Sequence, residues 1–257
     1  MDLSAKAAEL RRLHTDPELL VVVNVWDAIS AKVVADLPGC RALATASHSI
    51  AASRGYPDGE AIPLDLMIAG ISEITAATDL PVSADIEAGY GDAGEATRRT
   101  IGVGAVGGNL EDEMKPLAEA VAAVEAVVAA GEAEGVPFVL NARTDAFLKA
   151  GDRNLAEVLA DAIERGRAFL EAGADCVFVP GKLDKLAVGA LVETLGPQRL
   201  SVIGVPGSLT QAEFAEFGVA RISFGPWTQR VALTALADTG ANLLAGGALP
   251  EGVRPLN

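Results

Sequence analysis

The stretch 83–92, SADIEAGYGD, places two carboxylates, Asp85 and Glu87, where an apolar run ends. Residues two apart on a β-strand share a face, so both side chains should point the same way. A third acid, Glu111, follows the next apolar run. Three adjacent carboxylates repel one another unless a cation joins them, and oxygen ligands without His or Cys suit Mg²⁺ or Mn²⁺. The pattern therefore predicts a metal site formed by Asp85, Glu87 and Glu111.

Other polar side chains follow apolar runs in the same way. Arg143 needs an anionic partner there, which could be a substrate carboxylate or one of the acids. His48 is a candidate base, although a lone histidine after a strand is more often structural. An acid at a strand end can also be the cap of the next helix, and Asp27 and Asp145 are candidates for that role.

The elements that position these residues form a regular series. Apolar runs typical of parallel strands alternate with helical patterns, and no linker interrupts them. Eight such strand and helix units predict a single (β/α)₈ barrel domain over residues 1–257, with an N-terminal helix and a C-terminal helical extension. An open doubly wound sheet is the alternative. The expected strands are residues 19–25, 42–47, 81–86, 105–110, 137–142, 176–180, 200–205 and 219–224.

Composition excludes several classes of function. The chain carries 20 basic and 35 acidic residues, a net charge of −15, so we expect no nucleic-acid partner. No apolar run reaches the roughly 18 residues that a membrane span requires, and the charged N-terminus is unlike a signal peptide. Cys40 and Cys176 are too few for a disulfide framework. We therefore expect a cytoplasmic protein with no membrane partner and reduced cysteines.

Five stretches resemble the phosphoenolpyruvate mutase / isocitrate lyase superfamily in their order and spacing: NVWDAISAKV, TASHSIAASRGYPDGE, SADIEAGYGD, NLEDE and LNARTDAF. The resemblance implies a barrel with Mg²⁺ at its mouth and a small 2-oxo acid as substrate, handled through an enolate. It implies that Asp85 contacts the metal directly, and that Glu87 and Glu111 hold it largely through water. It adds Asp58 to the catalytic residues, with Arg143 and His48. The substrate-binding residues that it implies are Trp26, Thr45, Ser47, His48 and Arg143.

The chain departs from this superfamily at two loops. The carbon–carbon lyases carry a Lys-Lys-Cys-Gly-His loop after the fourth strand, whereas this chain reads EDEMKPLAEAV there. The gating loop of the mutase is also absent. The resemblance then implies carbon–carbon cleavage or decarboxylation of an oxaloacetate-like 2-oxo or 2-hydroxy diacid, with Lys115, His48 or Tyr90 as candidates for proton transfer.

The sequence is also compatible with other functions and assemblies. One alternative is phosphonomutase or phosphonopyruvate-type P–C chemistry, and another is a non-catalytic protein that binds a 2-oxo acid. A phosphate-binding aldolase is a third, although no lysine stands at a strand end to form a Schiff base. Members of the superfamily commonly form tetramers, so we expect a homo-oligomer, a dimer or tetramer, held by the apolar C-terminal segment. That segment could equally cover its own barrel.

Overall fold

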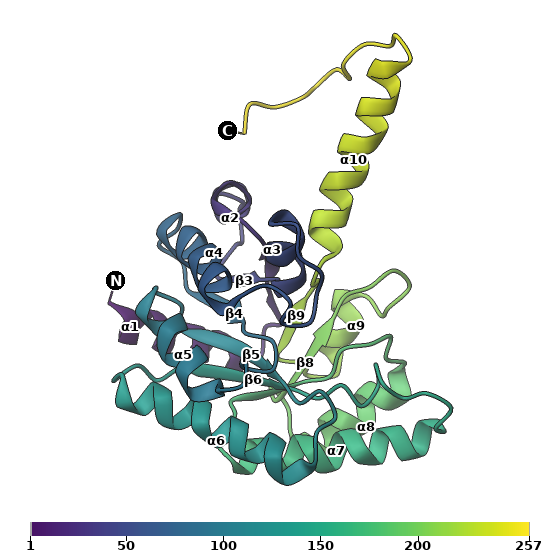
Figure 1. Ribbon diagram of the computed structural model, residues 1–257. Coiled ribbons are helices and arrows are strands. Elements are labelled where there is room, and N and C mark those ends of the chain that lie inside the picture. Colours follow the sequence, from purple (N-terminus) through teal and green to yellow (C-terminus); the bar gives the residue numbers. More distant parts are fainter. Residues whose placement is uncertain (1, 257) are drawn as a thin grey trace.

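Parallel strands and helices alternate along the chain in a computed structural model that describes residues 2–256 (Figure 1). The strands are β1 (Leu20–Val21), β2 (Val23–Val25), β3 (Leu43–Thr45), β4 (Val82–Asp85), β5 (Gly107–Glu111), β6 (Val139–Arg143), β7 (Cys176–Phe178), β8 (Leu200–Ile203) and β9 (Arg221–Ser223). The helices are α1 (Leu3–Thr15), α2 (Ala28–Ala35), α3 (Ser47–Ser53), α4 (Leu64–Ala76), α5 (Ala93–Gly102), α6 (Leu117–Ala133), α7 (Leu155–Glu171), α8 (Lys185–Leu195), α9 (Gln211–Glu216) and α10 (Trp227–Leu244).

The sheet closes on itself at the first strand, which is interrupted at Val22. The part before the interruption, β1, pairs with β9, and the part after it, β2, pairs with β3. Every strand pair in the sheet is parallel, in the order β1-β9-β8-β7-β6-β5-β4-β3-β2. The eight predicted strands thus appear as nine segments around one ring, and the predicted barrel is confirmed.

The N-terminal helix α1 packs against the strands with a buried apolar face. Ala7, Leu10 and Leu13 are fully buried. Leu10 lies so close to Gly107, at the start of β5, that a Cβ on this glycine would stand 2.7 Å from the leucine Cδ2. The same Cβ would lie 2.7 Å from the Val139 carbonyl oxygen of β6, a backbone atom that cannot easily move, so the close packing around β5 favours glycine here.

Helix caps fix the chain where it leaves the strand ends. Asp27 caps α2, because its Oδ1 accepts from the Ser30 N–H at 2.7 Å, and the Ser30 hydroxyl accepts from the Asp27 N–H at 3.1 Å. This reciprocal pair is a capping box. Asp145, the other expected cap, instead pairs with Arg143, as described below.

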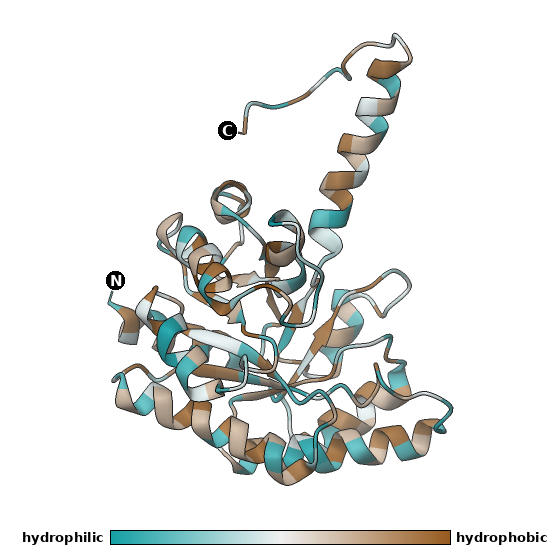
Figure 2. Cartoon of the chain, in the orientation of Figure 1, coloured by the Kyte–Doolittle hydropathy of each residue, from teal (hydrophilic) through white to brown (hydrophobic). Residues whose placement is uncertain are grey.

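The last helix, α10, projects away from the barrel rather than covering it (Figure 1). Gln229 in its first turn is buried, whereas apolar side chains farther along are exposed: Val231, Leu233, Leu236, Leu243 and Leu244. Figure 2 shows apolar residues spaced along this projecting helix. Within residues 2–256, no helix combines the length and the apolar content that crossing a bilayer needs.

Candidate active site

A cavity of about 400 Å³ opens at the carboxyl ends of the strands. Its charged lining residues are Asp58, Asp85, Glu87, Glu111, Arg143 and Arg230. Ser47 and His48, at the start of α3, lie in the same wall. The cavity therefore brings together carboxylates and arginines that stand far apart in the sequence.

Asp85 is held by the neighbouring strand end. Its Oδ2 accepts from the Ser47 hydroxyl at 2.8 Å and from the Ser47 N–H at 3.2 Å. Thr45 lies beneath it, buried, with its hydroxyl oxygen accepting from the Asp85 N–H at 2.8 Å. One face of the carboxylate is thus fixed by hydrogen bonds, and its orientation is set before any ligand binds.

Glu87 is buried beside Asp85, in the turn that follows β4. Its backbone φ is 52°, in the left-handed region that non-glycine residues seldom adopt. Its carboxylate accepts from the Glu60 N–H at 2.6 Å and from the Tyr90 hydroxyl at 3.2 Å. Burial, with Asp85 close by, raises the pKa of Glu87 to about 7. The side chain can therefore gain or lose a proton near neutral pH.

Glu60 is a residue that the sequence did not single out. One of its carboxylate oxygens accepts from the Ala88 N–H at 3.1 Å and from the Tyr90 N–H at 2.6 Å. Together with its own N–H bond to Glu87, this ties the loop between α3 and α4 to the turn after β4. Asp58 lies in that loop, exposed and in the cavity wall.

Glu111 and Arg143 form an ion pair across the ends of β5 and β6. Arg143 Nη1 lies 2.5 Å from Glu111 Oε2, and its Nε donates to Asp145 Oδ1 at 2.8 Å. Burial raises the pKa of Glu111 to about 8; the Arg143 charge opposes this rise, and nearby Asp85 adds to it. Arg143 has further N–H groups that could bind an anionic ligand in the cavity.

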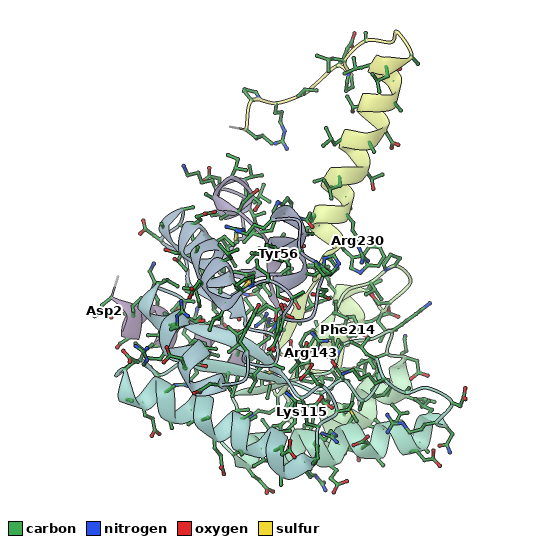
Figure 3. The ribbon with its side chains drawn as sticks, in the orientation of Figure 1. Asp2, Tyr56, Lys115, Arg143, Phe214 and Arg230 are labelled. Atoms are coloured by element: carbon green, nitrogen blue, oxygen red, sulfur yellow. The ribbon has the colours of Figure 1, made fainter. Side chains whose placement is uncertain are left out.

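The three candidates for proton transfer differ in position. His48 lines the cavity, and its buried Nδ1 has no hydrogen-bond partner among the described residues. Tyr90 donates to Glu87, and burial raises its pKa far above the usual range. Lys115 is exposed, outside the cavity lining, and pairs with Glu113 at 2.6 Å (Figure 3). Of the three, only His48 lines the cavity.

Two predicted substrate-binding residues lie elsewhere. Thr45 is under Asp85 rather than in the cavity wall. Trp26 lines a separate apolar groove with Ile29, Val33 and Val231, outside the barrel mouth. The reason is local: the Trp26 N–H donates to the Ser30 hydroxyl at 3.0 Å, so the chain is already turning into α2.

The carboxylates do not form a metal cage by themselves. Among residues 2–256, no three Asp, Glu, His or Cys side chains stand close enough together to hold an ion. Glu111 faces Arg143, and Glu87 is bonded to Glu60 and Tyr90. Mg²⁺ usually keeps several waters and takes only one or two protein carboxylates together with its substrate. The donor set fits such an ion, which Asp85, Glu87 and Glu111 would hold.

Comparison with known proteins establishes the family. The family model for phosphoenolpyruvate phosphomutase matches residues 10–244, and the chain belongs to this family, in the phosphoenolpyruvate mutase / isocitrate lyase superfamily. The structure resembles a candidate phosphonomutase of Burkholderia cenocepacia J2315, with 40% identity, a TM-score of 0.88 and coverage of 96% of this chain and 100% of the other.

Two further relatives carry named activities. An oxaloacetate acetylhydrolase, solved with its product oxalate, has 28% identity and a TM-score of 0.87 over 100% of this chain and 93% of that chain. The oxaloacetate decarboxylase of Paraburkholderia xenovorans (strain LB400) is 28% identical over 90% of this chain and 79% of its own length. Given such relatives, the protein is an enzyme of this lyase and mutase superfamily.

Proposed function

We propose that the protein is a Mg²⁺-dependent enzyme that cleaves or decarboxylates a small oxaloacetate-like 2-oxo diacid. The observation that carries the proposal is the placement of Arg143, the oriented Asp85, Glu87 and Glu111 in one cavity. Activities named for two relatives, an oxaloacetate decarboxylase and an oxaloacetate acetylhydrolase, support it.

Each residue of the cavity has a separate role in this proposal. Asp85, Glu87 and Glu111 would hold Mg²⁺, which when bound polarises the 2-oxo group and offsets the negative charge that develops there. Arg143 binds a substrate carboxylate through the N–H groups that Glu111 and Asp145 leave free. In decarboxylation the bond from C3 to the distal carboxyl breaks and its electron pair forms the enolate. His48, or water, then supplies a proton to C3.

The experiment is a turnover assay of oxaloacetate and other 2-oxo acids with Mg²⁺ or Mn²⁺. Free metal ions also decarboxylate oxaloacetate, so Arg143→Gln at equal metal concentration is the control. Turnover by the parent that exceeds this control supports the proposal. A protein that binds oxalate but turns over none of the panel would instead be a binding protein.

Phosphonate chemistry is the second candidate, favoured by the 40% identity to a candidate phosphonomutase. Its reaction exchanges a carbon–phosphorus for an oxygen–phosphorus bond. Incubation with phosphonopyruvate, followed by ³¹P NMR, separates the two candidates because the phosphorus resonance moves when that bond changes.

A further inference from the structure

Arg221 is a buried cation inside the barrel, beneath the candidate site. Ser223 of β9 and Asp85 of β4 both line the cavity, and residues two apart on a strand point the same way. Arg221 and Ser83, two residues earlier on these strands, therefore point into the barrel one layer below the cavity. Arg221 Nη1 donates to the Ser83 hydroxyl oxygen at 3.0 Å, although β9 and β4 are not neighbours in the sheet. The guanidinium thus crosses the barrel interior under the acids.

No carboxylate of the described residues pairs with this guanidinium. Arg221 is only 1% exposed, and none of the ion pairs within residues 2–256 includes it. Its Nε and Nη2 atoms have no hydrogen-bond partner among the same residues. These two atoms form the edge of a guanidinium that binds a carboxylate through two parallel hydrogen bonds. This edge of Arg221 therefore faces no anionic group of the described chain.

The titratable groups near Arg221 do not supply the missing negative charge. Cys176 is a thiol, because its Sγ donates to the Arg199 carbonyl at 3.2 Å and burial raises its pKa to about 12. His14 is neutral at pH 7, since burial and nearby Arg221 lower its pKa to about 4. Burial lowers the pKa of Arg221 itself to about 10, and nearby Cys176 and Asp85 oppose this fall. Arg221 therefore carries an unpaired positive charge at neutral pH.

This charge is unfavourable for the fold but useful to the site above it. Barrel interiors are usually filled by branched apolar side chains, and an unpaired buried charge is strongly destabilising. Two residues of a strand span roughly 7 Å, so the layer of Asp85 lies about that far above the layer of Ser83 and Arg221. Charges at such a distance inside a protein are screened far less than charges in water. We propose that Arg221 is a buried counter-charge that acts on the cavity through its electric field, favouring an anionic ligand and opposing a bound cation.

This inference rests on the proposed function, in which the cavity holds Mg²⁺ and a 2-oxo acid, and adds a residue that contacts neither. It predicts opposite effects on the two kinds of ligand. Removal of one positive charge leaves the cavity more negative, so a divalent cation should bind more tightly and a dianion more weakly. General damage to the fold would instead weaken the binding of both.

The test measures Kd by calorimetry for Mn²⁺ alone, and for oxalate at a Mn²⁺ concentration that saturates each variant. Arg221→Met removes the charge and keeps an unbranched side chain. Ser83→Asp keeps Arg221 but gives its guanidinium a carboxylate partner, so the charge is cancelled by a second route if Arg221→Met does not fold. Arg221→Lys keeps the charge, and Arg167→Met removes an exposed arginine of α7 outside the cavity lining. The buffer contains no halide, because a halide ion on the free guanidinium edge would neutralise Arg221.

We expect Arg221→Met and Ser83→Asp to bind Mn²⁺ roughly 10-fold or more tightly than the parent, and oxalate roughly 10-fold or more weakly, as Coulomb's law allows at an effective dielectric constant of about 20. Arg221→Lys should retain most of both parental affinities, and Arg167→Met should retain them fully. Parental affinities in Arg221→Met and Ser83→Asp, or weaker binding of both ligands, would overturn the inference and leave the proposed function intact. Failure of the parent to bind Mn²⁺ and oxalate would overturn both.

Discussion

Ser47 donates both its hydroxyl and its backbone N–H to the same oxygen of Asp85, at 2.8 and 3.2 Å. Asp85 is the last residue of β4 and Ser47 follows the neighbouring strand β3, so the bond pair joins two strand ends at the cavity wall. The arrangement leaves Oδ1 of Asp85 without a strong protein partner, because its contact with the Glu87 N–H is 3.4 Å long. Asp85 is therefore oriented and still able to bind a cation.

The first prediction concerns metal binding by this carboxylate. Asp85→Ala should abolish binding of Mg²⁺ or Mn²⁺ while the protein stays folded, since the hydrogen bonds lost contribute only about 1 kcal/mol each. Ser47→Ala should weaken binding without abolishing it, because the backbone N–H still orients Asp85. Calorimetry with Mn²⁺ measures both. Full metal affinity in Asp85→Ala would show that the site lies elsewhere.

The second prediction concerns Arg143 as a carboxylate binder. Arg143→Lys keeps the charge but loses the planar fork that could contact Glu111, Asp145 and a ligand together. We expect the affinity for oxalate, a planar dianion that resembles an enolate of a 2-oxo acid, to fall by roughly 10-fold or more. Competition against turnover gives the inhibition constant. Equal inhibition of parent and variant would remove Arg143 from the site.

The third prediction is a pH dependence of stability. A glutamate ordinarily has a pKa of 4.5, whereas Glu111 in the folded protein has a pKa of about 8. Between pH 4.5 and 8, the folded state therefore holds a proton that the unfolded state has lost. Stability from this group is fully present below pH 4.5 and is lost as pH rises toward 8. Glu87, with a folded pKa of about 7, acts in the same direction.

Urea unfolding from pH 5 to 8.5, with a chelator present, measures this effect as the difference between the parent and Glu111→Gln. Taking this difference cancels the contributions of all other titrating groups. Buried His14 is one of them: burial and nearby Arg221 lower its pKa to about 4. His14 therefore makes stability rise with pH, opposite to the effect of Glu111. We expect a smaller loss of stability with pH in the variant. Mg²⁺ should stabilise the parent increasingly as pH rises, because it competes with the protons on these carboxylates. Identical slopes would contradict the raised pKa of Glu111.

The fourth prediction concerns α10. Leu236 is 67% exposed and Leu244 is 93% exposed on a helix that projects from the barrel (Figure 2). Exposed apolar residues along a whole helix are typical of an interface with another chain. We expect a dimer or tetramer in light scattering, and dissociation in the double variant Leu236→Lys/Leu244→Lys. The control is Leu186→Lys on α8, where the leucine is 78% exposed and the oligomer should persist. A monomeric parent would refute this expectation.

The barrel could be predicted because its signals are local. Parallel strands covered on both faces read as short apolar runs, and each run coincides with a strand of the structure. Residues at strand ends share one rim in a barrel, so the sequence also indicated that Asp85, Glu87, Glu111 and Arg143 lie together. Their roles in metal and substrate binding stay predictions.

The sequence alone could not reveal features that depend on contacts between segments far apart in the chain. Glu60 acts through a loop bonded to the turn after β4, a contact between two irregular segments. Arg230 stands in an apolar helical stretch, and only the closure of the ring at β9 brings it to the cavity. The family resemblance implied that Trp26 binds substrate, whereas in the structure Trp26 lines the separate apolar groove beside α2.

The last prediction is that oxaloacetate exceeds isocitrate as a substrate by orders of magnitude in kcat/KM. A lyase acting on isocitrate must protonate the carbon that leaves, and a positioned acid contributes about 10²–10⁴-fold. The connection between β5 and α6 spans only residues 112–116, and Asp112 within it is fixed by Arg165 at 3.1 Å. Neither cysteine can serve instead, since Cys40 and Cys176 lie outside the cavity lining and burial raises the pKa of both thiols. Decarboxylation does not require a positioned acid, because CO₂ departs without a proton and water can protonate the enolate.

Parallel assays of CO₂ release from oxaloacetate and glyoxylate release from isocitrate, at equal Mg²⁺, measure the ratio of the two kcat/KM values. Efficient glyoxylate release would reverse the order and would identify His48, the candidate that faces the cavity, as the residue to substitute next.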